Sequence, residues 1–175
     1  GRAQSFTIFD TSSPTKYLSP LDASVDATWT DPDFDAEANG FSAGTAALGF
    51  ESRPNDRTNF VGLFDTELPD QTHAVYTRFE FELNKASVIT DLTLELYCDN
   101  AYVAYLNGVK VAEDNAPAVL GWFSQAADRG RRDRDVVEDP IELSLSEHRG
   151  ALRDGKNVLA IHVLNHFQDN DDLLL

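Results

Sequence analysis

The segment from 99 to 111, DNAYVAYLNGVKV, restricts the fold of this chain more than any other part of the sequence. An Asn-Gly pair at 107–108 separates two runs rich in β-branched and aromatic residues. Asn-Gly tolerates the positive φ angles of a two-residue type I′ turn, whose twist suits two neighbouring antiparallel strands. We therefore predict a β-hairpin with a structural tip. Any polar groups that it displays lie at its start, at Asp99 and Asn100.

The rest of the chain consists largely of short alternating segments between glycine and proline turn signals, a pattern typical of a β-sandwich or barrel. Apolar residues alternate with polar ones over 77–83, 92–98 and 141–145. The run 157–164 is almost continuously apolar, which predicts a central strand buried on both faces. Helical periodicity is weak. We expect one helical turn near 146–152, and loops over 65–70 and over the charged stretch 128–139.

The length of 175 residues suits one domain with a sizeable core, so we predict a single all-β domain over 1–175, an antiparallel β-sandwich. The chain begins with Gly1 instead of Met and ends in three leucines. We expect it to be excised from a larger multidomain protein. It contains no apolar run long enough to cross a bilayer, so we expect no membrane insertion.

The chain is strongly acidic, with 30 acidic and 14 basic residues and a formal net charge of −16. Such a surface repels phosphate backbones, which excludes nucleic acid as an expected partner. It fits high solubility, a saline environment or the binding of hard cations through oxygen ligands. The single cysteine, Cys98, excludes an internal disulfide and a multi-cysteine zinc site.

Four blocks of this sequence, in order along the chain, resemble the jelly-roll modules of the galactose-binding-domain-like superfamily. They are the segment 29–35 with 47–50, the strand 76–81, the hairpin 99–111, and the strand 155–163. This version of the module is common in large exported bacterial proteins, those of planctomycetes especially. The resemblance implies a jelly-roll sandwich, and a secreted protein located extracellularly or at the cell surface.

The sequence departs from the family pattern at several positions. Ala36 replaces an aspartate, Phe41 replaces a tryptophan, and Asn100-Ala101 replaces the last two residues of an Asp-Asp-Gly triplet. The segment 169–172, Asp-Asn-Asp-Asp, stands where the family often has Ser-Ser-Asp. The first two departures weaken the transfer of individual site residues around the N-terminal loop.

In the resembling superfamily, a structural calcium ion often lies between the N-terminal loop and the last strand. Calcium takes six to eight oxygen ligands, which clusters of short acids on loops supply. An EF-hand loop is excluded, because the glycine at its sixth position and the acid at its twelfth are missing. The alternative is that these acids only form turns and solvate the surface. The residues predicted to bind calcium are Asp31, Asp33, Asp35 and Asp172, with Asp169 and Asp171 next to the last of them.

A carbohydrate site needs an aromatic face for the sugar ring and planar polar groups for its hydroxyls. Trp122 and Phe123, in a predicted loop, suit the first requirement. The alternative is that Trp122 plugs the end of the sandwich, as we expect Trp29 to lie in the core. The residues predicted to contact a glycan are Trp122, Arg53, Asn55, Asp99, Asn100 and Tyr102.

We find no catalytic motif. The four histidines have no metal-ligand spacing, and His162 shares a strand face with Val158 and Ala160, which suits a hydrogen-bonded core histidine. There is no nucleophile elbow, and Cys98 continues the apolar face of its strand. We expect a non-enzymatic domain that can accompany an enzyme.

These observations favour a carbohydrate-binding module that binds an oligo- or polysaccharide through loops at one end of the sandwich, with a structural calcium ion. Its expected partners are a glycan and other domains of the same parent protein. The alternative is a protein–protein interaction or spacer module of a large extracellular protein. A hydrolase or lyase built on the sandwich is a third and remote hypothesis.

Overall fold

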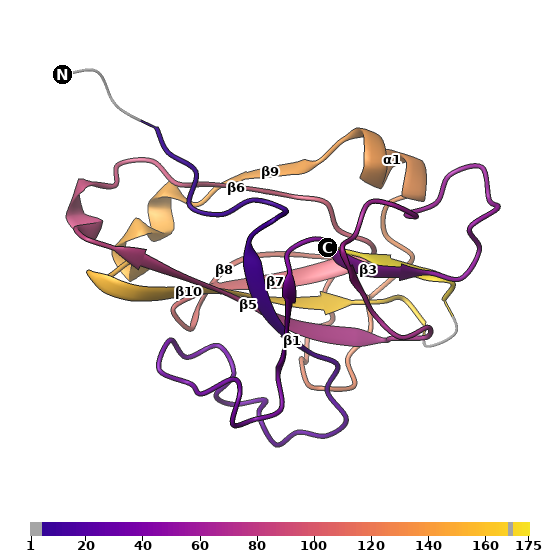
Figure 1. Cartoon of the computed structure of the whole chain (residues 1–175), viewed down its shortest axis with the longest axis horizontal. Coiled ribbons are helices and arrows are strands. Elements are labelled where there is room, and N and C mark those ends of the chain that lie inside the picture. Colours follow the sequence, from indigo (N-terminus) through magenta and orange to yellow (C-terminus); the bar gives the residue numbers. More distant parts are fainter. Residues whose placement is uncertain (1–4, 168–169) are drawn as a thin grey trace.

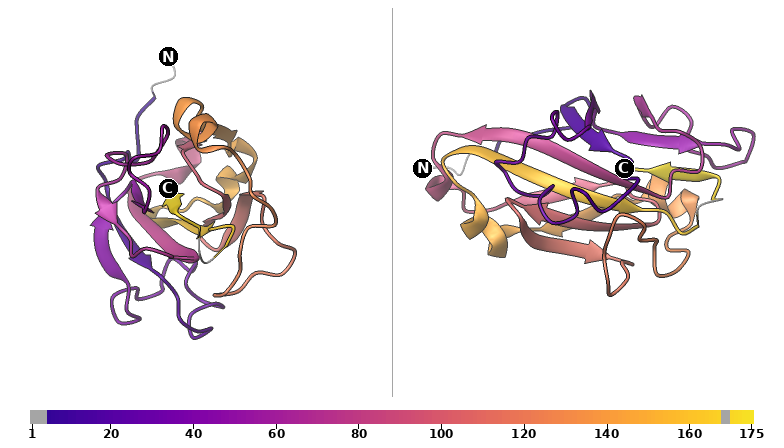
Figure 2. Two further views of the ribbon diagram at one scale, coloured as in Figure 1. Left: turned by 90° about the vertical axis from the view of Figure 1, so that its right-hand side faces the viewer. Right: turned by 90° about the horizontal axis from the view of Figure 1, so that it is seen from below.

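The computed structural model describes residues 5–167 and 170–175 and arranges their strands in two packed layers (Figures 1 and 2). The first layer is a six-stranded antiparallel sheet in the order β2-β1-β5-β10-β7-β8. Its strands are β1 (Pro14–Leu18), β2 (Ser42–Thr45), β5 (Ala74–Leu83), β7 (Ala101–Leu106), β8 (Val109–Asp114) and β10 (Gly155–Leu164).

The second layer consists of two smaller sheets. One has the order β11-β3-β4, and the other pairs β6 with β9. Their bounds are β3 (Leu48–Glu51), β4 (Thr66–Glu67), β6 (Thr93–Leu96), β9 (Ile141–Ser144) and β11 (Asp172–Leu174). Only the short β3–β4 pair is parallel among the described strand pairs. The predicted all-β antiparallel sandwich is confirmed.

The main core lies between the two layers. It joins apolar residues of β5, β7 and β10 to those of β3, β6 and β11, with Leu159, Ile161 and Val163 contributed by β10. As predicted, β10 is central, and it pairs with both β5 and β7. The predicted hairpin is also confirmed: Leu106 faces Val109, and Asn107 and Gly108 have φ angles of 50° and 82°.

The helical segments are short. The predicted helical turn is the 3₁₀ helix η2 (Ser146–Ala151), and another 3₁₀ turn, η1, covers Ala86–Val88. The charged stretch that was expected to be a loop contains a helix, α1 (Asp133–Glu138), and the other expected loop contains β4. The prediction missed α1 because only one of its side chains, Val136, is buried, which leaves no apolar periodicity to detect.

The N-terminal loop, residues 19–41, covers the outer face of the six-stranded sheet, below it in Figure 1. The ring of Trp29 stacks on Tyr76 of β5 with centroids 4.2 Å apart, and Trp29 is only 4% exposed. Val158 and Ala160 of β10 complete this second cluster. Trp29 is therefore a core residue, as predicted. No helix in the described part of the chain is long and apolar enough to span a bilayer.

Candidate functional site

The loops that carry the predicted glycan residues meet at one end of the sandwich. There Leu164, the last residue of β10, pairs with Ala74 and Ala101, the first residues of β5 and β7. The loop after β3 reaches the same end, because the Ser52 amide donates to the Asp171 carbonyl at 2.7 Å. We call this end, formed by residues 52–60, 97–100, 115–132 and 165–172 where described, the rim.

Asparagine side chains hold the rim together. Asn100 Nδ2 donates to the Arg129 carbonyl at 2.9 Å, and its Oδ1 accepts from the His166 amide at 3.0 Å. Asn165 is fully buried, and its Nδ2 donates to the carbonyls of Thr72 and Asp172 at 3.2 and 3.0 Å. Asn170 Nδ2 donates to Asn165 Oδ1 at 2.7 Å. Each of these amides links two or more loops, so the rim is an ordered polar surface.

Two buried carboxyl groups lie within this network. Asp99 is 1% exposed, and its Oδ1 accepts from Asn100 Nδ2 at 2.7 Å. Burial, and then repulsion by Asp172 and Asp133, raises the pKa of Asp99 well above its usual range. Burial also raises the pKa of Asp172 to about 7, with repulsion by Asp133 next in size. Ionisation of both carboxyls together is therefore costly.

The structure places the predicted aromatic residues at the rim. Trp122 is half-buried: its main-chain amide donates to Asp26 Oδ2 at 3.0 Å, and its carbonyl lies 3.3 Å from His73 Nε2. Its neighbour Phe123 is 66% exposed, and the two rings meet edge to face with centroids 5.5 Å apart. Trp122 therefore neither plugs the sandwich completely nor stands free of it.

Arg53 and Asn55 are exposed on the loop after β3, at the same end of the molecule. Arg53 forms an ion pair with Asp171 at 3.0 Å. Trp122 is fixed by Asp26 and His73 on the side of the N-terminal loop. The predicted arginine and tryptophan thus belong to one rim but are held by different loops.

Three other residues predicted to contact a glycan are buried. Tyr102 is 3% exposed and points into the main core, where burial raises the pKa of its phenol to about 12. Asp99 and Asn100 are 1% and 8% exposed. The prediction that these side chains are displayed at the hairpin's start was wrong for all three, because the hairpin begins beneath the second layer, where Asp99 bridges Leu174 of β11. Asp99 and Asn100 instead organise the rim from within.

The aspartates predicted to bind calcium are not brought together. Asp31, Asp33 and Asp35 are exposed, and their carboxylates accept from the Asp33 amide, Arg153 and the Ala38 amide. Arg153 precedes β10, whereas Asp172 lies beside Asn165, which follows it. A ten-residue strand, about 30 Å long, separates these two ends. Within 5–167 and 170–175, no three His, Cys, Asp or Glu side chains form a metal-binding group. Asp169 lies outside the described residues.

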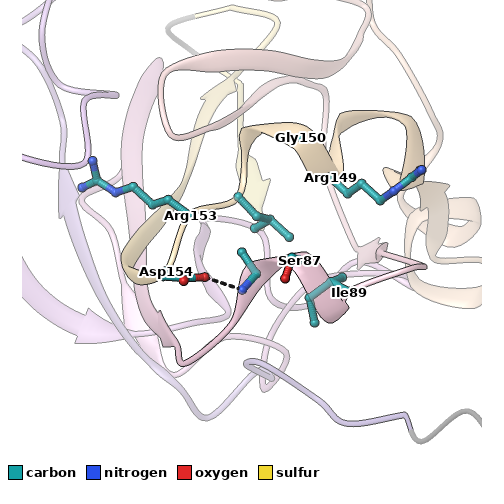
Figure 3. Close-up of a pocket in the computed structure, with 8 residues that line it drawn as sticks. Ser87, Ile89, Arg149, Gly150, Arg153 and Asp154 are labelled. Carbon is teal, nitrogen blue, oxygen red and sulfur yellow. Dashed lines mark hydrogen bonds between the residues drawn. The ribbon is translucent and has the colours of Figure 1, made fainter.

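A shallow pocket of about 410 Å³ lies at the opposite end of the sandwich, between η1 and η2 (Figure 3). Asp154 there accepts from the Ala86 amide at 2.7 Å. The side chains of Arg149 and Arg153 point away from each other in this view. The pocket contains none of the predicted glycan residues and has no aromatic lining, so it does not suit stacking on a sugar ring.

On the outer face of the large sheet, sequence reasoning predicted the buried His162 but missed the burial of Arg78. Arg78 is fully buried, and it donates to the carbonyls of Trp29 and Asp31, the latter at 3.0 Å. His162 is 2% exposed, and its Nε2 has no hydrogen-bond partner, so the expectation of a hydrogen-bonded core histidine does not hold for that atom. Burial, and then His73, lowers the pKa of His162 to about 3, which keeps its ring neutral.

No family model matches this sequence, and no curated protein matches it. Among solved structures, a β-glucuronidase of Bacteroides uniformis is similar to 94% of this chain, with a TM-score of 0.52 and 14% sequence identity. A glycoside hydrolase family 2 β-glucuronidase matches 99% of the chain, with a TM-score of 0.51 and 12% identity. A variant of B. uniformis β-glucuronidase 2 with two aspartates replaced by alanine, described as a mutant in calcium binding, has a TM-score of 0.51 at 14% identity over 93% of the chain. This chain spans only 17–18% of the length of those three proteins. Sequence identities of 12–14% show a shared β-sandwich fold and nothing more.

Proposed function

We propose that this chain is a non-catalytic, galactose-binding-domain-like carbohydrate-binding module, carried as one accessory domain by a larger secreted or cell-surface protein. The observation that carries the proposal is the aromatic pair Trp122–Phe123, which is partly exposed on a rim rich in polar side chains. The sandwich fold that it shares with part of several β-glucuronidases supports a role beside glycan chemistry. A domain that occupies about a sixth of such a chain suits an accessory part.

In this proposal, a sugar ring stacks on the exposed aromatic surface of Phe123 and the edge of Trp122. Aromatic rings contact the apolar C–H face of a sugar, while planar polar groups bind its hydroxyls. Arg53 and Asn55 are exposed at the same end of the molecule and provide such groups. An acidic sugar would compete with Asp171 for the guanidinium of Arg53.

The test is a glycan array of neutral and acidic polysaccharides, probed with and without a chelator. We expect Trp122→Ala and Phe123→Ala each to weaken binding by about tenfold, the effect of roughly 1.4 kcal/mol of lost stacking and apolar contact. Phe6→Ala is the matched control, because it removes an exposed phenylalanine (62% exposed) that is not part of the rim. Wild-type protein that binds no glycan on the array would contradict the proposal.

A structural calcium ion is a separate part of the proposal, and the acidic composition of the chain supports it. The loop aspartates Asp31, Asp33 and Asp35 are not its ligands, because each already accepts a local hydrogen bond and they form no metal-binding group of three among the described residues. The measurement is the thermal unfolding midpoint with calcium and with a chelator. An ion that binds only the folded state raises the midpoint.

The alternative function is an interaction or spacer module. Three apolar side chains of loops at the rim are exposed: Val119 (81%), Phe123 (66%) and Phe167 (54%). Such a group suits contact with another domain of the parent protein as well as contact with a sugar. Limited proteolysis of the intact parent separates the two functions. A docked module is protected at residues 115–125, whereas a free glycan-binding module is cut there.

A further inference from the structure

The last strand brings Asp172 beside Asp99, although 73 positions separate them in the sequence. Asp99 forms an antiparallel bridge with Leu174, and its amide donates to the Leu174 carbonyl at 3.1 Å. Residues two apart on a strand point to the same face, so Asp172 is the diagonal neighbour of Asp99 on one face of this pairing. The two carboxyl groups meet there.

A third carboxylate, that of Asp133 on α1, acts on this pair through its charge. Val136 of this helix packs against Leu174 and Phe60 in a small buried cluster. Asp133 lies three residues earlier, on the same side of the helix as Val136. Its charge acts on both Asp99 and Asp172. Acids from three separate elements therefore converge at the rim.

No cationic side chain of the described residues lies within 4 Å of the carboxylates of this acidic group, since none of the ion pairs includes Asp99, Asp172 or Asp133. Asp99 Oδ2 is buried and accepts no hydrogen bond from an N–H or hydroxyl group of the described residues, while the carboxyl groups of Asp99 and Asp172 lie within hydrogen-bonding reach of each other. Among the described residues, two side-chain amides donate to the pair: Asn100 to Asp99 Oδ1, at 2.7 Å, and Asn170 to Asp172 Oδ1, at 3.3 Å. The nearby arginines form their ion pairs with other acids, Arg53 with Asp171 and Arg131 with Asp139, and Arg131 Nη1 is itself buried without a hydrogen-bond partner. An unpaired buried carboxylate is costly unless a proton or a cation neutralises it.

We propose that Asp99 and Asp172 bind one divalent cation of the calcium class, which supplies the missing counter-charge between them. Hard cations take carboxylate oxygens together with amide, carbonyl and water oxygens, so two carboxylates suffice as the charged ligands. Asp133 adds negative charge at longer range and favours the divalent ion over a monovalent one. The ion fastens the C-terminal strand β11 to the start of β7 and thereby closes the rim.

This cation site is distinct from the loop aspartates 31, 33 and 35 and does not depend on glycan binding. Neither Asp99 nor Asp172 forms an ion pair with a described residue, whereas Asp33 does. The cation therefore displaces no described ion pair from the proposed site. Calcium binding at this site is measured by the unfolding midpoint and by the number of ions bound per chain, and neither measurement uses a glycan. A negative result for the cation site is therefore distinguishable from a negative result for the glycan proposal.

The experiment uses the whole chain, stripped of metal by a chelator and then titrated with calcium alone by calorimetry, with magnesium in a parallel titration. We expect one calcium ion per chain. At a calcium concentration about 100-fold above the dissociation constant, the unfolding midpoint should rise by about 5–10 °C. Asp172→Asn should abolish this rise, and it should also raise the midpoint of the metal-free protein, because it removes one of two adjoining buried charges.

Asp35→Asn is the matched control, an aspartate on the N-terminal loop, and it should keep the full calcium response. Asp99→Asn is the second variant, for use if Asp172→Asn does not fold. Three outcomes overturn the proposal: a wild-type chain that binds no calcium, a response that survives substitution at both positions, or a response lost in Asp35→Asn alone. In the first case, the two carboxyls share a proton instead.

Discussion

Two buried charges of opposite sign make a useful comparison. Arg78 on β5 and Asp99 before β7 are both almost inaccessible to solvent, at 0% and 1% exposure. Arg78 donates to three carbonyl oxygens of the N-terminal loop and lies 3.4 Å from the carboxylate of Glu80. Asp99 meets one side-chain amide and another carboxyl group. The surroundings complement the first charge and oppose the second.

The difference distinguishes Arg78, a buried charge whose neighbours stabilise it, from Asp99, a buried carboxyl group whose acidic neighbours destabilise its charged form. The guanidinium of Arg78 also lies over the Phe34 ring, 5.3 Å from its centroid, so only its Nε lacks a partner. It fixes the loop that covers the outer face of the large sheet. Asp99 and Asp172 have no such pairing with a cationic side chain of the described residues, and buried groups of this kind cluster at functional sites.

The largest expected effect on the free energy of unfolding is at Arg78. Arg78→Met should destabilise the protein by about 3–5 kcal/mol, because it leaves the carbonyls of Trp29 and Asp31 without their donor and frees the N-terminal loop. Urea denaturation measures the change. Arg53→Met, which removes an exposed ion pair with Asp171, should cost at most about 1 kcal/mol. Equal effects at the two arginines would break the comparison.

The next effect concerns the backbone around Asp99. Gly130 has a φ angle of 69°, and a Cβ atom there would lie 2.6 Å from the carbonyl oxygen of Asn100. Gly130→Ala should cost about 2–4 kcal/mol, from the clash and the left-handed backbone together.

Gly40→Ala is the matched control in the N-terminal loop. Its φ is 83°, with nothing within 4 Å of the added Cβ. It should cost only the backbone part, about 1–2 kcal/mol. Thermal unfolding of both variants compares the two regions directly. If the Gly130 variant were as stable as the Gly40 variant, the backbone of the rim would have moved to relieve the clash at little cost in free energy. The rim would then not be rigidly ordered.

The smallest expected effect is a pH dependence under the N-terminal loop. His162 packs edge-on against Trp29 and Tyr76, with its pKa lowered from 6.5 to about 3. The unfolded chain binds a proton at His162 below pH 6.5, and the folded chain does not until about pH 3. This contribution to stability is therefore complete above pH 6.5 and is lost as the pH falls, by about 2 kcal/mol between pH 6.5 and 5.

Denaturation curves of wild type and His162→Leu across that pH range measure this contribution as the difference between their slopes. The difference is needed because Asp172, with its raised pKa, acts in the opposite sense over the same range. His148→Leu serves as the control at a half-buried histidine of η2. Parallel pH profiles for wild type and His162→Leu would show that the buried ring is not the source.

Much of the fold could be predicted because it is encoded locally. The turn at Asn107-Gly108 depends on the φ angles that these two residues tolerate, and the central position of β10 follows from its apolar run. The helix α1 escaped prediction because a single buried residue, Val136, holds it in place. Of the residues predicted to contact a glycan, Arg53 and Asn55 are exposed at the rim and their role stays a prediction, while Tyr102 is a core residue.

The sequence by itself determined where strands form and where they turn, since alternation and turn chemistry act over a few neighbouring residues. The sequence also showed an excess of acidic residues. It did not show which of them are buried, because nothing in the sequence distinguishes a buried aspartate from an exposed one. Only the tertiary structure decided that. The pairing of Asp99 with Leu174 turns two ordinary aspartates into adjoining buried charges, and the low dielectric of their surroundings makes that contact costly.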